Sequence, residues 1–421
     1  MADSRGRDVF RLRGFFAYWA AYTVSGFGTS LTIIALQVLV LVDLGGSAAD
    51  VGLLNAARWL PYLAFGLVVG ALVDRRRRKP LLVGTDLGRA VVLLGIPLLS
   101  IVGWLSLPAV LALVVAVGLL SLVGDAASQS LVPRIVPRHA LVAAHARTDQ
   151  SDAIVQTSGP VVAGALVSLI GAAFAIVVDA VSYLLSAFAI GRIRVDEPVQ
   201  PAAAPRRLRE EIADGLRWVY RHRVLGPMAF GTHGWFLFSS ILSTVFTPFV
   251  LVGLHLDPFQ LGVALAGAGV AALIGSTLSH RAGTRWGAGY AVIASNLLMV
   301  VGWCIIALTP HSIAPWLIVV VLTLGQAFHG FGMGLSNANE MGYRQAVTPD
   351  ELQARTNTTM RSMNRAAIVV GAPIGGLLAD SIGYTPTLWI AIGGILAVTA
   401  FLAVSPFRTA RHDGTELPDG G

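Results

Sequence analysis

Residues 14–42 read GFFAYWAAYTVSGFGTSLTIIALQVLVLV, and none of these side chains is charged. A helix needs about 20 predominantly apolar residues to cross a hydrocarbon core of roughly 30 Å, so this run is long enough to span a membrane. Comparable runs recur to the end of the chain. They predict an all-α membrane protein with twelve transmembrane helices in two groups of six, at residues 14–42, 51–73, 81–102, 107–132, 144–170, 172–190, 228–254, 259–280, 288–309, 313–338, 357–379 and 386–405.

The composition excludes a soluble globular protein. Of the 421 residues, 55% are hydrophobic and 13% are charged, and the mean hydropathy is +0.71, whereas about a quarter of the residues of a soluble domain are charged. The first apolar run is too long for a cleavable signal peptide, so we expect it to remain as a span. Cys304 lies alone in an apolar run, which leaves no disulfide framework and no cysteine-based metal site.

The net charge of +7 does not indicate a nucleic-acid partner, because the basic residues are confined to alternate loops. The connections near residues 43–50, 103–108, 170–173, 254–260, 309–314 and 381–386 contain no Lys or Arg, whereas the other connections and both termini are rich in Arg. The positive-inside rule therefore predicts cytoplasmic termini. The expected location is the bacterial inner membrane, with the lipid bilayer as a partner.

The longest polar stretch divides the chain in two. We predict an N-terminal bundle at residues 1–190, a cytoplasmic linker at 191–227, a C-terminal bundle at 228–405 and a cytoplasmic tail at 406–421. Residues 208–223 place their apolar side chains on one helical face, which predicts an amphipathic surface helix. An internal repeat supports two related halves: Pro137, Leu141, Gly159, Pro160 and Gly164 recur as Pro349, Leu352, Gly371, Pro373 and Gly376.

The segment GALVDRRRRK at residues 70–79 follows the second predicted span. It resembles the loop 2–3 signature of the major facilitator superfamily, G-x-L-x-D-R-x-G-R-K, except that Arg77 replaces a glycine. The resemblance implies the fold of that superfamily and a cytoplasmic gate in which an arginine pairs with an acid at the end of helix 4. The corresponding residues here are Gly70, Asp74, Arg75, Arg78 and Asp125. The alternative is a basic cluster that only sets the topology.

Weaker motifs in the same order resemble bacterial exporters similar to the enterobactin exporter and macrolide efflux permeases. They include SGFG at residues 25–28, ARWLP at 57–61, Asp86 with Arg89, DAVSYLLS at 179–186 and RQAVTPDELQAR at 344–355. In the fifth span, Gly159, Pro160 and Gly164 resemble the antiporter signature G-P-x-x-G-G, and Gly371, Pro373 and Gly376 repeat this packing motif in the eleventh. These resemblances favour export over import; helix packing without directional meaning is the alternative.

Charged side chains inside the spans indicate a functional or structural role, since placing a charge at the bilayer centre costs on the order of 3 kcal/mol. Asp179 and Arg58 lie deepest in their spans, and Asp149 and Asp152 lie nearer an end of the fifth span. One interpretation is a carboxylate that carries a proton, with Arg58 as its partner; the other is a static, paired charge. Candidates for the substrate cavity are the polar and aromatic residues Gln37, Trp59, Gln326, His329 and Asn337, although such residues more often serve packing.

Three other classes of protein fit the sequence less well. An ATP-driven pump would need a Gly-Lys-Ser/Thr loop, but the single lysine, Lys79, precedes Pro80. A metalloenzyme would need a ligand cluster such as His-Glu-x-x-His, which is absent from the sequence. The third class is a channel, but two repeated halves are more typical of a transporter than of a channel. The sequence therefore predicts a monomeric, cofactor-free, proton-coupled efflux permease for a small amphiphilic molecule such as an antibiotic or secreted metabolite, with solute uptake as the alternative.

Overall fold

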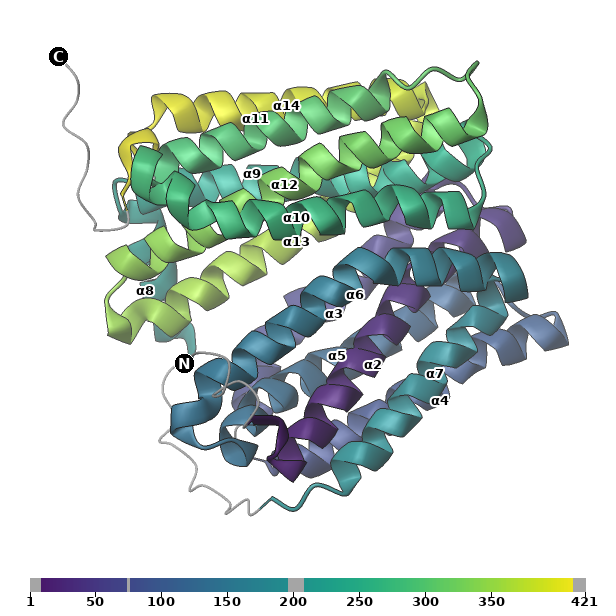
Figure 1. Cartoon of the computed structure of the whole chain (residues 1–421), viewed down its shortest axis with the longest axis horizontal. Helices are drawn as coiled ribbons and strands as arrows, with labels where there is room; N and C mark the ends of the chain where they lie inside the picture. The colour runs from purple at the N-terminus through teal and green to yellow at the C-terminus, as the bar shows by residue number, and fades with distance from the viewer. Residues whose placement is uncertain (1–8, 74–75, 196–207, 412–421) are drawn as a thin grey trace. The chain divides into compact units, whose positions relative to one another are not determined.

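The computed structural model describes residues 9–73, 76–195 and 208–411, and this part of the chain consists mainly of long helices joined by short loops (Figure 1). Its long helices are α2 (Arg13–Val38), α3 (Ala48–Val73), α4 (Arg78–Val102), α5 (Leu107–Ile135), α6 (Leu141–Ile170), α7 (Ala172–Gly191), α9 (Leu225–Pro248), α10 (Pro258–Trp286), α11 (Ala288–Ala307), α12 (Pro315–Val347), α13 (Asp350–Ile382) and α14 (Tyr384–Val404). In the described residues, eleven helices are long and apolar enough to cross a membrane. The 26-residue α3 is not among these eleven, so the count of twelve spans stays a prediction.

Two helices extend well beyond the apolar runs that predict them. The tenth span is predicted at residues 313–338, but α12 continues to Val347; the eleventh is predicted at 357–379, but α13 begins at Asp350. The added turns carry polar and charged side chains, which hydropathy excludes from a span although they form helix readily in water. α13 also begins directly after Pro349 with Asp350 and Glu351 in its first turn, and acidic residues there interact favourably with the helix dipole.

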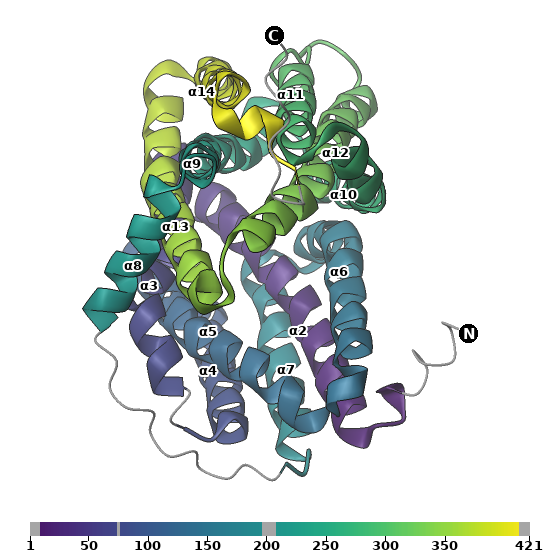
Figure 2. The ribbon, with the colours of Figure 1, turned by 90° about the vertical axis from the view of Figure 1, so that its left-hand side faces the viewer.

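The first compact unit comprises residues 1–46 and 57–204. Within it, α7 packs against both α2 and α4, α5 packs against α4, and α6 packs against α2. Figure 2 shows α2 between α6 and α7. This arrangement turns one face of α2 toward two helices that lie more than 100 residues later in the chain.

The second unit comprises residues 47–56 and 205–421. Its closest helix pairs are α10 with α12, α11 with α12, and α9 with α13 and α14. The start of α3 belongs to this unit, because the carboxylate of Asp380 accepts hydrogen bonds from the amides of Ala48 and Ala49, each at 3.0 Å. Helix α8 (Leu208–Arg221), where the sequence predicts an amphipathic helix, packs on α13 through an ion pair between Arg355 and Asp214 at 3.0 Å.

The first span of each half ends in the same way. α2 continues into a π-helical turn at Leu39–Asp43, and α9 continues into one at Phe249–Gly253. The sequences LVLVD and FVLVG place three buried apolar residues at matching positions. Because π-helical turns are rare, their recurrence at equivalent positions supports the internal repeat seen in the sequence.

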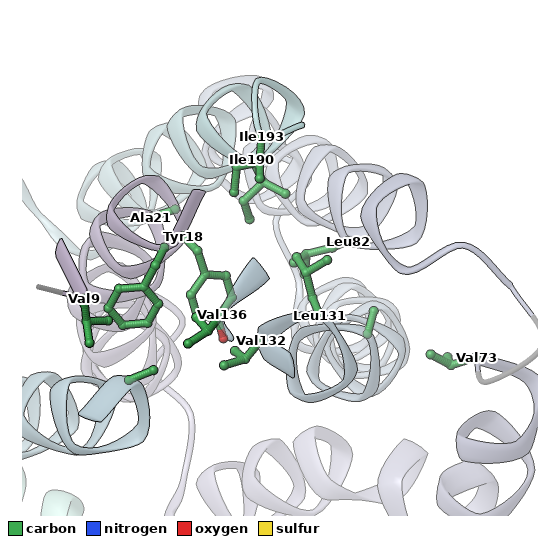
Figure 3. Packing of buried hydrophobic residues seen from close by; sticks show 13 residues of the cluster. Val9, Tyr18, Ala21, Val73, Leu82, Leu131, Val132, Val136, Ile190 and Ile193 are labelled. Carbon is green, nitrogen blue, oxygen red and sulfur yellow. The ribbon is translucent and has the colours of Figure 1, made fainter. Parts of the chain in front are cut away.

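A cluster of buried apolar side chains packs together at one end of the helices of the first unit. Figure 3 shows Tyr18 from α2, Leu82 from α4, Leu131 from α5 and Ile190 from α7 turned toward one another. Each is at least 96% buried. Burial of such side chains contributes roughly 1.5–3 kcal/mol each, so this cluster fixes the ends of the helices that carry polar residues further along.

Candidate functional site

A cavity of about 370 Å³ lies inside the first unit. Helices α2, α4, α5, α6 and α7 all contribute to its wall, and Tyr18, Leu82 and Ile190 of the apolar cluster form part of it. The wall combines polar side chains with apolar ones such as Ile33 and Val155. Its titratable side chains are Tyr18, Tyr22, Asp86, Arg89, Asp125, Asp152 and Tyr183.

Helix α2 supplies a polar stripe to this site. Residues 18, 22, 25, 29 and 32 are Tyr, Tyr, Ser, Thr and Thr, and their spacing of three or four residues places them on one helical face. Their partners come from other helices: Tyr18 bonds Ser128 at 2.7 Å and Thr29 bonds Tyr183 at 3.0 Å. The spacing of these polar residues is visible in the sequence, but within residues 14–42 only the SGFG motif and Gln37 were singled out from the sequence.

Asp179 on α7 is 1% exposed and is held by hydroxyl groups. Thr32 donates to its Oδ2 at 2.5 Å, and Ser182 donates to its Oδ1 at 3.1 Å. Gly28 makes this approach possible, because a methyl group at that position would overlap the carboxylate of Asp179 and the hydroxyl of Ser182. Neither Asp179 nor Thr32 lines the cavity, but their neighbours Thr29 and Tyr183 do, so Asp179 lies beside it.

Asp86 and Arg89 on α4 form a buried ion pair inside the same unit. Ser186 also donates to Asp86 at 2.6 Å, and the guanidinium of Arg89 lies 4.3 Å from the ring centre of Tyr183. In the sequence, these two residues were noted only as one of the motifs that resemble bacterial exporters. Their i, i+3 spacing inside an apolar run is the signal that predicts a paired charge.

Arg89 lies against the ring of Tyr183, one turn after Asp179 on α7. Arg58 lies over the ring of its neighbour Trp59, 5.5 Å from the ring centre, and its partnership with Asp179 stays a prediction.

Two further carboxylates reach the cavity, and each is bound by a tyrosine. Tyr22 donates to Asp152, with oxygen distances of 2.9 and 3.0 Å, and Tyr62 donates to Asp125 at 2.7 Å. Asp125 and Asp149 are both exposed, but Asp149 does not line the cavity. Of the two neighbouring aspartates on α6, only Asp152 can meet a molecule bound there.

The predicted cytoplasmic gate lies partly outside the described residues, because Asp74 and Arg75 are not among them. Gly70 lies within α3, and Arg78, which begins α4, is 6% exposed. The pairing of Arg78 with Asp125 stays a prediction.

The packing motif of the fifth and eleventh spans falls inside two long helices. Pro160 lies within α6 and Pro373 within α13, so neither helix is interrupted. A methyl group at Gly159 would contact Ser30 of α2, and one at Gly371 would overlap Ser240 and the backbone of α9. Gly164 and Gly376 are buried. These residues permit close helix contact in both units.

The remaining cavity candidates are not gathered at one place. Trp303 donates to Nδ1 of His329 at 3.1 Å, which makes that nitrogen an acceptor and leaves the proton of the neutral ring on Nε2. Gln326 is 4% exposed, and Gln37 lies on α2. Asn337 lines a cavity of about 30 Å³ in the second unit, together with Glu340, to which Thr232 donates at 3.0 Å. That space suits a water molecule rather than a substrate.

Comparison with known proteins identifies the family. Residues 8–416 match the family of transmembrane secretion effectors, whose relatives are transporters of the major facilitator superfamily. The chain belongs to this family. The resemblance in its loop and helix motifs is thereby confirmed, and the protein is a multi-pass protein of the bacterial plasma membrane.

Similar proteins in this superfamily include efflux pumps. The chain is 26% identical over 379 residues to the multidrug efflux pump Tap of Mycolicibacterium fortuitum, covering 88% of this chain and 90% of that protein. It is 23% identical over 392 residues to macrolide efflux protein A of Streptococcus pyogenes, covering 91% of this chain and 93% of that protein.

Solved structures share the fold at low identity. A point mutant of the nucleoside transporter NupG superposes with a TM-score of 0.76 at 13% identity, covering 93% of this chain and 99% of NupG. A bacterial homologue of the iron transporter ferroportin, in an inward-facing state, gives 0.72 at 15% identity and covers 93% and 98% of the two chains. These likenesses establish an all-helical transporter fold of the major facilitator type.

Proposed function

We propose that this transporter is a proton-coupled efflux permease for small amphiphilic molecules, and that it works by alternating access as a monomer. The arginine-rich loops support cytoplasmic termini. Export is supported by the motifs of the fifth span and by the efflux pumps among the relatives. The gate residues of the loop after α3 would then close the cytoplasmic side, while the glycines of α6 and α13 allow close helix contact.

Asp179 is the proposed proton carrier, and the hydroxyl groups that bind its carboxylate support this assignment. A proton carrier has to be hydrogen-bonded both as a carboxylate and as a carboxylic acid. The hydroxyls of Thr32 and Ser182 can rotate to donate to the first form or to accept from the second. Asp86 lacks this freedom, because Arg89 is always charged and holds it as an ion pair. The two buried aspartates of α4 and α7 thus have different roles.

The cavity suits an amphiphilic molecule because apolar and polar groups alternate on its wall. Ile33, Leu82 and Val155 provide apolar surface next to the tyrosines and carboxylates. Its volume of about 370 Å³ is at the lower end of the range of roughly 300–1,000 Å³ for drug-sized ligands.

The test uses purified protein in vesicles with an imposed pH gradient, and a labelled substrate found among candidate antibiotics. We expect Asp179→Asn to abolish gradient-driven accumulation while substrate exchange without a gradient continues, because an amide cannot give up a proton in the transport cycle. Asp179→Glu should retain part of the coupling.

The matched control is Asp257→Asn. Asp257 is an exposed helix cap in the second unit, and asparagine caps helices as well as aspartate does, so this variant should transport normally. Gradient-driven accumulation by Asp179→Asn at the wild-type rate would remove Asp179 as the carrier. Lower drug levels in cells that carry the protein indicate export, whereas higher levels would indicate uptake.

A further inference from the structure

The cavity of the first unit carries more negative than positive charge. Three carboxylates line it, from Asp86, Asp125 and Asp152, against one guanidinium, from Arg89. Arg89 is already paired with Asp86. In the part of the chain that the structure describes, no ion pair gives Asp125 or Asp152 a basic partner. The wall therefore carries two more formal negative charges than positive ones, although Asp125 also interacts electrostatically with Arg58 and Arg89 without pairing with either.

Each of these two carboxylates has acceptor capacity to spare. A carboxylate offers about four acceptor positions, and the described contacts supply one tyrosine hydroxyl to each: Tyr22 to Asp152 and Tyr62 to Asp125. Asp125 is exposed, whereas Asp152 is half-buried, and a poorly compensated charge becomes more costly as its surroundings become less polar. A cation in the cavity would be attracted strongly for the same reason.

The same wall shows two other features that suit a bound molecule. The rings of Tyr18 and Tyr22 are stacked, with centres 6.0 Å apart and planes at 23°, and both line the cavity. Aromatic faces attract cations. The hydroxyl oxygen of Ser25, one turn after Tyr22, is buried and has no hydrogen-bond partner among the described residues. A buried hydroxyl normally has a hydrogen-bond partner, which can be an ordered water or a polar group of a bound molecule.

A metal ion is a poor candidate for this site. Among the described residues, no group of three or more His, Cys, Asp or Glu side chains is placed to hold one. Much of the remaining wall is aliphatic and aromatic, including Ile33, Val155 and Tyr183. Such a surface binds carbon-rich molecules, since it replaces water contacts with apolar ones.

From these observations we propose that the cavity of the first unit selects organic cations, holding an ammonium- or phosphonium-type centre between Asp152 and Asp125 with its apolar part against the tyrosines of α2. This rests on the proposed transport function and names its substrate class. Asp179 takes no part in binding, because Thr32 and Ser182 enclose it beside the cavity.

The test is equilibrium binding of tetraphenylphosphonium and tetraphenylborate to the full-length protein in nanodiscs, with binding to empty nanodiscs subtracted. These ions have nearly the same size and shape and opposite charge. We expect the wild type to bind the cation at least tenfold more tightly than the anion. Asp152→Asn and Asp125→Asn should each weaken cation binding about tenfold, whereas anion binding should not weaken.

Asp149→Asn is the matched control, because it removes the same charge from the same helix at an exposed position outside the cavity. It should change cation binding less than twofold. Each variant is first checked for normal elution and helical content, and Asp152→Glu, which retains the charge, should bind the cation nearly as well as the wild type. Equal binding of the two ions, or equal losses in Asp149→Asn and Asp152→Asn, would overturn the proposal.

The outcome separates this inference from proton coupling. Asp179→Asn should keep the full preference for the cation even where gradient-driven transport is lost. A protein that prefers the cation but ignores the pH gradient would contradict only the proposed coupling. A protein that couples to the gradient but binds both ions equally would contradict only the cation site.

Discussion

The buried ion pair between Asp86 and Arg89 offers a direct test of how charge is held inside the first unit. The side chains are 2% and 9% exposed, and the pair is supported by Ser186 on α7 and by the face of Tyr183. We consider Asp86→Asn, which removes one charge with little change in shape. The buried guanidinium of Arg89 then loses its ion-pair partner and keeps an electrostatic interaction with Asp125.

The expected cost follows from the burial of the pair. Removing one partner of a buried ion pair typically destabilises a protein by about 3–5 kcal/mol. Asparagine keeps an oxygen that can accept from Arg89, and the pair borders a cavity that water can enter, so we expect a loss of about 2–3 kcal/mol, below that range. Arg89→Met should also destabilise the protein. The double variant Asp86→Asn/Arg89→Met leaves no unpaired charge, so its loss should fall short of the sum of the single losses by about 1–2 kcal/mol.

The assay is reversible unfolding in mixed micelles at increasing SDS fraction, followed by tryptophan fluorescence. Asp214→Asn provides the control, because Asp214 is 44% exposed and pairs with Arg217 at 3.6 Å and with Arg355 at 3.0 Å, and ion pairs open to solvent contribute about 1 kcal/mol or less each. Strict additivity of the Asp86 and Arg89 variants would show that the two charges do not stabilise each other. A loss in Asp86→Asn no larger than that in Asp214→Asn would refute the assignment of a buried pair.

Two further predictions concern close contacts. Gly28→Ala should destabilise the protein by about 1–3 kcal/mol and reduce gradient-driven transport, because the added methyl overlaps Asp179; Gly84→Ala, where the added methyl meets open space, should be neutral or slightly stabilising by unfolding in micelles. Equal behaviour of the two alanine variants would contradict the close approach of α2 to α7. Asp380→Asn should speed hydrogen exchange at the amides of Ala48 and Ala49 by several-fold, because an amide oxygen accepts one of the two bonds that the carboxylate accepts; unchanged protection would contradict this cap.

The sequence alone determined the membrane class, the order of the helices and the family. These features depend on local sequence, because an apolar helix of sufficient length is stable in lipid whichever helices it packs against. The loop motif at residues 70–79 and the repeated glycines then pointed to the superfamily that the comparison confirms. The predicted positions of the helix ends were less accurate, as α12 and α13 show. Hydropathy reports the membrane-embedded part of a helix and not its full length.

Only the tertiary structure decided which polar residues meet. The bond between Tyr22 and Asp152 joins residues 130 apart, and that between Thr32 and Asp179 joins residues 147 apart. Their contact depends on the rotation of α2 about its axis and on which helices pack against it, and neither follows from an apolar run. Packing likewise placed Asp152 in the cavity and left Asp149 outside. Three residues apart on α6, they differ by about 60° around the helix axis and about 4.5 Å along it, and only the neighbouring helices decide which of the two positions meets the cavity.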